Sequence, residues 1–260
     1  MFRSAALLVL LIAALPLSLL SSARSAELVV VGQATTAGAL RLLVPRFEKE
    51  TGDKVRLMLG NPGVTYDNLK VMPNADVVIV ASALHDRLIK ENVLTDSTKV
   101  ALGESEIGMA VSAKAKKPAS FRDKAAFIAF LRKVKTIGLV DPKGGSGTSP
   151  PFMKAVEDLG IASEIAPKYR YIPGAGENVA EAIAKGEVET GATAIPELAP
   201  NKGLRVVGPV PADVLVFGSV TAAYLGPHAA NTAEAQKFLR FLASPAATRA
   251  FRAIGLSPPG

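Results

Sequence analysis

The sequence contains no cysteine and no tryptophan, and its 260 residues include only two histidines, His85 and His228. Without cysteine the chain cannot form disulfides, thiolate metal sites, a cysteine nucleophile or a lipid anchor at a cleavage-site cysteine. The two histidines lie far apart and have no acidic residue at metal-ligand spacing, so neither a metal site nor a Ser-His-Asp triad is expected. We therefore predict a protein with no metal and no cofactor of its own.

The net charge of +7 comes from basic residues spread along the chain, without a basic block or interleaved aromatic residues. Nucleic acid is therefore not an expected partner. The glycine run at 144–147 lacks the Gly-Lys-Ser/Thr ending of a phosphate loop. With 49% hydrophobic and 20% charged residues, the composition is typical of a folded globular protein.

The N-terminus has the layout of a secretory signal peptide. A basic start at Met1–Arg3 precedes an apolar run at 5–20 and a stretch rich in small residues at 21–26. The apolar run is short for a membrane anchor and contains Pro16, and no second run is long enough to span a bilayer. We predict that residues 1–26 are cleaved and that the mature protein, which is not a lipoprotein, is periplasmic.

Apolar segments alternate with amphipathic ones along the rest of the chain. This alternation predicts an α/β fold in which mainly parallel sheets are flanked by helices. We expect a serine to cap two of the helices, Ser82 in one and Ser120 in the other, and Pro45 to kink a third. The expected strands are 27–31, 55–59, 76–81, 107–113, 136–140, 169–172, 190–195 and 204–207, and a longer apolar segment covers 214–225.

Four strand-to-helix turns, at 33–36, 60–63, 144–149 and 174–179, are rich in small and polar residues. The first N–H groups of a helix lack partners within it, and glycine lets the backbone approach a ligand closely. Ligands of α/β sheets bind where the carboxyl ends of strands meet such turns, so we predict an anion site. An ordinary helix cap that binds nothing is the alternative for each turn taken singly.

Several segments resemble one known family. They are LVVVGQATTAGAL (28–40), RFEKETG (46–52), PNADVVIVAS (73–82), DPKGGSGTSPPFMKAVEDLGI (141–161) and FLASPAATRAFRAIGLSPP (241–259). Through them the chain resembles the periplasmic molybdate-binding proteins, solute-binding components of ABC importers with the type 2 periplasmic-binding-protein fold. The resemblance implies two lobes, one formed by 27–107 plus 215–260 and the other by 108–214, with the ligand between them. It also implies a membrane permease as partner, and we expect a monomer.

The resemblance further implies which residues bind the ligand. Carried over by position, they are Thr35, Thr36, Asn61, Gly63, Ser146, Gly147, Thr148, Ser149, Asn178 and Val179, the last through its backbone amide. Two family hydroxyl groups are missing here. The second-turn serine is replaced by Pro62 or Gly63, and the family's tyrosine aligns with about Ala194.

We expect a binding protein and not an enzyme. The protein is expected to capture a small molybdate- or tungstate-like oxyanion and to deliver it to the permease. The missing hydroxyl groups leave two alternatives open. One is a binding protein for a small carboxylate, and the other is a periplasmic isomerase of small tricarboxylates such as aconitate. An isomerase needs a proton-transfer group, for which Glu177 and Glu197 are the nearest candidates in the sequence.

Overall fold

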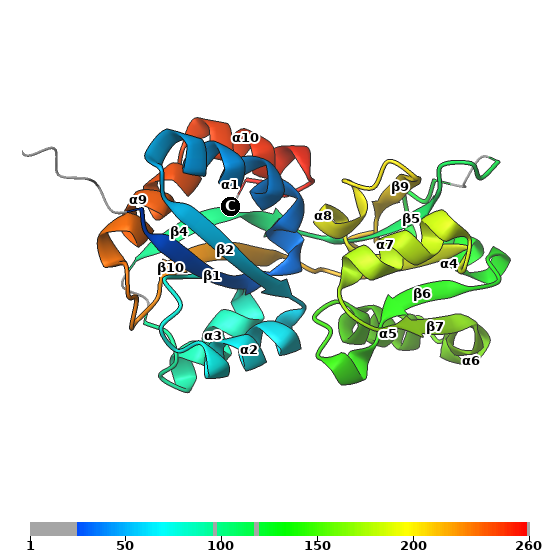
Figure 1. Ribbon diagram of the computed structural model, residues 1–260. Helices are drawn as coiled ribbons and strands as arrows, with labels where there is room; N and C mark the ends of the chain where they lie inside the picture. The colour runs from blue at the N-terminus through cyan, green and yellow to red at the C-terminus, as the bar shows by residue number, and fades with distance from the viewer. Residues whose placement is uncertain (1–24, 96–97, 117–119, 259–260) are drawn as a thin grey trace, which may run out of the picture.

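The computed structural model describes residues 25–95, 98–116 and 120–258, so the expected signal peptide, apart from its last two residues, lies outside the described residues. Two five-stranded sheets, each covered by helices, form two lobes that lie side by side (Figure 1). Within the described ranges no helix is long and apolar enough to cross a membrane.

The first lobe contains a sheet with strand order β2-β1-β3-β10-β4. Its strands are β1 (Glu27–Gln33), β2 (Lys54–Gly60), β3 (Val77–Ala81), β4 (Lys99–Ser105) and β10 (Ser219–Leu225). On one face of the sheet, three helices pack over a core that includes Leu40, Phe238 and Phe251. On the other face, Leu69 and Leu84 belong to a second core. The helices are α1 (Ala37–Thr51), α9 (Thr232–Leu242) and α10 (Pro245–Ala253) on the first face, and α2 (Pro62–Val71) and α3 (Ser82–Lys90) on the second (Figure 1).

The second lobe repeats this plan with strand order β7-β6-β8-β5-β9. Its strands are β5 (Ile107–Ser112), β6 (Ile137–Val140), β7 (Tyr169–Ile172), β8 (Thr190–Ala194) and β9 (Leu204–Pro209). Phe127, Phe152 and Ile165 belong to the core under one face, whereas Val179 and Leu198 belong to the core under the other. The corresponding helices are α4 (Lys124–Lys133), α5 (Ser149–Asp158) and α6 (Ala162–Ile165), and α7 (Gly176–Lys185) and α8 (Ile195–Leu198). Three short 3₁₀ turns complete the set: η1 (Ala34–Thr36), η2 (Pro142–Gly144) and η3 (Ala166–Lys168).

The prediction of an α/β fold with mainly parallel sheets is confirmed. In the first sheet β10 pairs antiparallel with both β3 and β4, and the other pairs are parallel. In the second sheet β5 pairs antiparallel with both β8 and β9. A single reversed strand with a neighbour on each side leaves the other four strands of each sheet pointing the same way. Their carboxyl ends consequently meet at one edge, which faces the other lobe.

The chain passes between the sheets twice, once after β4 and once between β9 and β10. The second connection packs on the second lobe, because Leu215 and Phe217 contact its core. We propose that the lobes divide near the expected positions, with the first boundary at about residue 106 and the second at about residue 218. Two connections of this kind are typical of proteins whose lobes move about a hinge.

Three local predictions differ from the structure. Strand β4 was not predicted, because Gly103 and Glu104 interrupt its apolar run, and it pairs with β10 through a β-bulge. Ser82 is the first residue of α3 and donates to the Val220 carbonyl oxygen at 3.2 Å, so it does not cap the helix. Helix α4 is capped by Asp123, whose carboxylate accepts from the Ala126 N–H at 2.8 Å, and not by Ser120.

Candidate functional site

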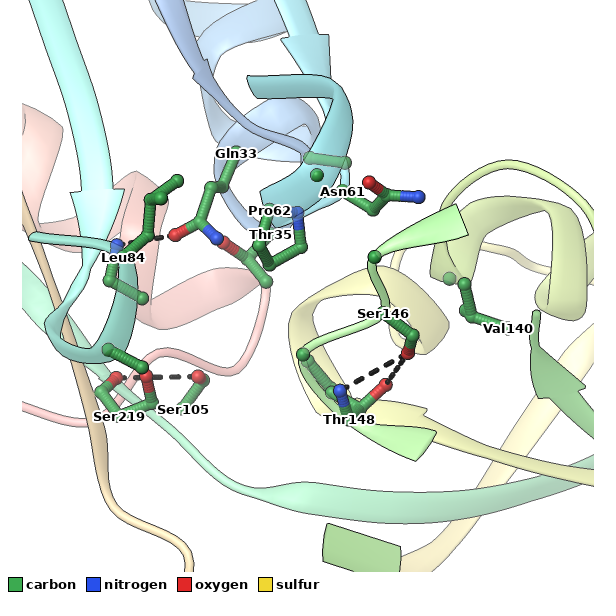
Figure 2. Close-up of a pocket in the computed structure, with 18 of the residues that line it drawn as sticks. Gln33, Thr35, Asn61, Pro62, Leu84, Ser105, Val140, Ser146, Thr148 and Ser219 are labelled. Atoms are coloured by element: carbon green, nitrogen blue, oxygen red, sulfur yellow. Dashed lines mark hydrogen bonds between the residues drawn. The ribbon is translucent and has the colours of Figure 1, made fainter. Parts of the chain in front are cut away.

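A cavity of about 350 Å³ lies between the lobes, and we call it the interlobe cavity. The last residues of strands from both sheets line it, among them Gln33, Ala81, Val140 and Ala194. Figure 2 shows Gln33, Thr35 and Asn61 of the first lobe facing Ser146 and Thr148 of the second. The position agrees with the rule that α/β sheets bind ligands outside the carboxyl ends of their strands.

Six of the ten predicted ligand-binding residues line this cavity: Thr35, Asn61, Gly63, Ser146, Gly147 and Thr148. The other four have different roles in the described structure. The Thr36 hydroxyl donates to the Gln33 carbonyl oxygen at 2.9 Å, and the Ser149 hydroxyl donates to the Val140 carbonyl oxygen at 2.6 Å. The Asn178 amide oxygen accepts from the Ala175 N–H at the start of α7, and Val179 is fully buried in the second lobe.

The glycine-rich turn before α5 is held by its own serine. The Ser146 hydroxyl oxygen accepts from the N–H groups of Thr148 and Ser149 at 3.3 and 3.1 Å. These bonds satisfy two of the N–H groups that a helix N-terminus leaves unpaired, so they are not available to a ligand. Gly145, at φ +81°, makes the turn possible because a side chain is strained in that conformation.

Thr35 carries a hydroxyl group on the first-lobe side of the cavity. Its Oγ1 atom is buried and has no hydrogen-bond partner in the part of the chain that the structure describes. A buried hydroxyl without a partner is costly to stability, and most such groups in native proteins are paired. A bound anion would supply the missing acceptor.

Asn61 and Gly63 join the lobes to each other. The Asn61 side-chain amide donates to the Gly174 carbonyl oxygen at 2.9 Å, and the Gly63 N–H donates to the Gly145 carbonyl oxygen at 3.2 Å. The Asn61 amide oxygen accepts from the Val64 N–H, so Asn61 also caps α2. The lobes therefore meet through groups that the sequence assigned to the ligand.

A bidentate ion pair also joins the lobes. The Arg41 guanidinium on α1 donates to both carboxylate oxygens of Glu177 on α7, each at 2.8 Å. Glu177 is absent from the wall of the interlobe cavity, so the ion pair closes the lobes beside the cavity and does not face a ligand within it.

Arg87 supplies a positive charge that the sequence did not reveal. It lines the cavity from α3, its guanidinium lies 3.7 Å from the centre of the Tyr66 ring, and its Nε donates to Glu91 at 2.9 Å. This bond raises the pKa of Arg87 above its usual value, so the group stays charged at any physiological pH. No motif marked this arginine, because only the fold brings α3 to the cavity.

Glu197 supplies the other charged group of the cavity wall, and it is buried. One carboxylate oxygen accepts from the Gly176 N–H at 3.1 Å and the other from the Thr193 hydroxyl at 2.7 Å. Burial raises the pKa of Glu197 to about 7, and the nearby charge of Glu177 adds to this while the hydrogen bonds oppose it. Of the two acidic residues that the sequence suggested for proton transfer, Glu197 alone lines the cavity.

The rest of the wall is largely apolar, with Leu84, Ala194 and Phe217 among its members. Within the described residues there is no group of three or more His, Cys, Asp or Glu side chains that could hold a metal ion. His85 stacks on the Tyr224 ring, with 4.8 Å between the ring centres. The arrangement can therefore bind an anion through O–H and guanidinium donors while it contacts an apolar part of the same molecule.

Two lobes with a cavity between them are typical of solute-binding proteins. Residues 28–257 match the family described as bacterial extracellular solute-binding protein, and the chain belongs to that family. A protein of Pseudomonas sp named aconitate isomerase is 29% identical over 260 residues, which cover 96% of this chain and 94% of the relative.

Solved structures share the fold. The periplasmic molybdate-binding protein of Azotobacter vinelandii is 19% identical, covers 90% of this chain and 100% of its own, and has a TM-score of 0.71. PEB3, a protein of Campylobacter jejuni, in its L-phospholactate-bound form is 18% identical, covers 89% of this chain and 100% of its own, and has a TM-score of 0.64. The resemblance to the molybdate-binding proteins that the sequence suggested is thereby confirmed at the level of fold.

Proposed function

We propose that this protein captures a small organic anion with two or three acidic groups, of the di- or tricarboxylate class, between its lobes. The observation that carries the proposal is the wall of the interlobe cavity. It combines Arg87, whose guanidinium also pairs with Glu91, and the Thr35 hydroxyl, which has no partner in the described residues, with apolar side chains. The carboxylate groups of such a ligand would accept hydrogen bonds from these donors, and its carbon skeleton would contact the apolar side chains.

The size of the cavity favours this class over the expected molybdate- or tungstate-like oxyanion. A volume of about 350 Å³ lies within the range of about 300–1,000 Å³ that is typical of pockets for organic ligands. A tetrahedral oxyanion has one central atom and four oxygens, offers no apolar surface, and would fill only part of this space. Ala194 lines the cavity where the family has a tyrosine, and the smaller side chain leaves more space for an organic ligand.

The family supports the rest of the transport role. Its members are extracellular, as the predicted signal peptide requires of this chain, and they bind solutes. We propose that the mature protein works in the periplasm as a monomer and delivers its ligand to the membrane permease of an ABC importer. The contacts between the lobes supply the closed surface that such a permease would recognise.

A thermal-shift panel on the mature protein tests the ligand class. Citrate, cis-aconitate, molybdate, tungstate, sulfate and phosphate are compared, and a ligand at about 1,000 times its Kd stabilises by roughly 4 kcal/mol. We expect a shift with the carboxylates that is lost in Arg87→Ala but kept in Arg249→Ala, a control on the distant helix α10. A shift with molybdate and tungstate alone would restore the oxyanion role, and no shift with any anion would refute the proposal.

Turnover of the bound carboxylate is a second candidate function. The observation that favours it is Glu197, a buried carboxyl group in the cavity wall whose pKa of about 7 suits proton transfer at neutral pH. The relative named aconitate isomerase supports the same possibility. Incubation of the protein with cis-aconitate in D₂O, followed by NMR, tests it. Isomer formation with deuterium incorporation that is lost in Glu197→Gln would establish an enzyme, and an unchanged spectrum would exclude this candidate.

A further inference from the structure

A row of hydroxyl groups connects Glu197 to the glycine-rich turn. The Thr193 hydroxyl lies 2.7 Å from the Glu197 carboxylate and 3.4 Å from the Thr148 hydroxyl. The Thr148 hydroxyl in turn lies 3.5 Å from the Ser146 hydroxyl. Thr193 is fully buried and Thr148 nearly so, and both Thr148 and Glu197 line the interlobe cavity.

We propose that Glu197 is the proton-carrying residue of the anion site, and that its protonation turns the Thr148 hydroxyl toward the ligand. The inference rests on the proposed function, since it requires that an anion enter the interlobe cavity. It adds to that function a coupling between anion capture and proton uptake.

The reasoning follows from the single proton on each hydroxyl group. When Glu197 is ionised, Thr193 donates to it, and the Thr193 oxygen can then only accept, so it draws the Thr148 proton away from the cavity. When Glu197 is protonated, it donates to Thr193 instead. Thr193 then donates to Thr148. The Ser146 oxygen, 3.5 Å from Thr148, already accepts from two N–H groups, so the Thr148 proton is free for an anion.

Charge acts in the same direction. An ionised carboxylate in the cavity wall repels an anion, whereas a neutral carboxylic acid does not, and low dielectric makes the difference large. The charged groups that surround Glu197 are Arg87 across the interlobe cavity, and Arg41, Glu177 and Glu181 on its other side. The Arg41–Glu177 ion pair is the same with and without a ligand, whereas an entering anion adds a negative charge that acts on Glu197.

The burial of Glu197 supports the proposal independently of the hydroxyl row. Its pKa of about 7 means that both protonation states are populated near neutral pH in the ligand-free protein. A bound anion raises this pKa further. Binding is then accompanied by uptake of close to one proton above about pH 7, and the Kd rises toward tenfold per pH unit.

Isothermal titration calorimetry of the mature protein with citrate, cis-aconitate and molybdate tests the coupling. These anions are almost fully ionised from about pH 7 to about pH 9, so they contribute little titration of their own. Titrations in buffers with different ionisation enthalpies count the protons taken up. We expect Glu197→Gln to bind with a Kd that no longer depends on pH and with no proton uptake, because its amide donates to Thr193 permanently.

Three further variants separate the proposal from a general loss of structure. Glu181→Gln removes an exposed charge of α7 that pairs with Lys185 and that solvent screens from Glu197, so it should keep the wild-type pH dependence. Thr193→Val should weaken binding at about pH 7 by roughly tenfold, the effect of one charge-assisted hydrogen bond, and Thr193→Ser should restore it.

Equal pH dependence in wild type and Glu197→Gln would overturn the coupling while leaving anion capture intact. Unchanged affinity in Thr193→Val would overturn the role of the hydroxyl row. No binding of any of the three anions at any pH would overturn the proposed function, and the coupling with it.

Discussion

The replacement of Glu197 by glutamine should change how the stability of the ligand-free protein depends on pH. The buried carboxyl has its pKa raised from 4.5 to about 7. The folded state therefore binds a proton more tightly than the unfolded state, and stability falls as pH rises from about 4.5 through about 7. At 1.36 kcal/mol per pKa unit, the loss between about pH 5 and about pH 8 is roughly 2–3 kcal/mol.

Glutamine keeps the shape of the side chain and can keep both hydrogen bonds. Its oxygen can accept from the Gly176 N–H, and its amide can donate to the Thr193 hydroxyl oxygen. We expect guanidinium denaturation curves of Glu197→Gln to lack this loss, so that the variant gains roughly 2–3 kcal/mol over the wild type between about pH 5 and about pH 8. The exposed Glu181→Gln should follow the wild type. Wild-type and Glu197→Gln stabilities that run parallel across this range would refute the reasoning, whatever their absolute difference.

Other predictions concern the lobes and the site. Arg41→Ala should open the lobes, seen as a larger radius of gyration in X-ray scattering, at a stability cost of about 1 kcal/mol or less. Thr35→Val should weaken citrate binding about tenfold without loss of stability, because the removed hydroxyl has no partner in the described chain. Gly145→Ala should cost more than about 1 kcal/mol in urea unfolding, since φ is +81° and the new Cβ would lie 2.6 Å from Gly63 Cα.

Matched controls make these outcomes specific. Arg46→Ala breaks an ion pair within α1 and should leave the scattering unchanged. Gly160→Ala imposes a similar strain at φ +70° but meets open space, so it should cost less than Gly145→Ala. Equal scattering of Arg41→Ala and Arg46→Ala, or equal stability of Gly145→Ala and Gly160→Ala, would show that the contacts between the lobes do not have the effects assigned to them. A Thr35→Val variant with wild-type affinity would remove Thr35 from the site.

Much of the fold was predictable from the sequence, because it depends on local patterns. The run Leu28–Val31 is apolar at every position, as a strand covered on both faces must be, and it forms the middle of β1. The stripe formed by Leu40, Leu43, Val44 and Phe47 likewise marked the buried face of α1, and Gly52 ends that helix in the left-handed conformation. Strand β4 lacked such a signal, since its pairing with β10 depends on residues more than 100 positions away.

The site was only partly predictable. The sequence located the turns that line the cavity, because glycine and hydroxyl residues at strand ends are a local signal. It could not decide which donors face the ligand. Asn61 and Gly63 contact the opposite lobe, so their partners are fixed by how the two lobes meet. Ser146 accepts from two N–H groups of its own turn, which depends on the conformation of that turn.

The positions of the two charged residues in the cavity wall could not be predicted either, because they follow from the packing of distant segments. Arg87 comes from the helix after β3 and Glu197 from the short helix after β8, and no spacing in the sequence relates them. The burial that raises the pKa of Glu197 is likewise a property of the packed lobes and not of its neighbours in the chain. The sequence by itself therefore determined the family, the fold and the turns that form the cavity. Only the packing of distant segments decided its size, its charges and the side chains that a ligand would meet.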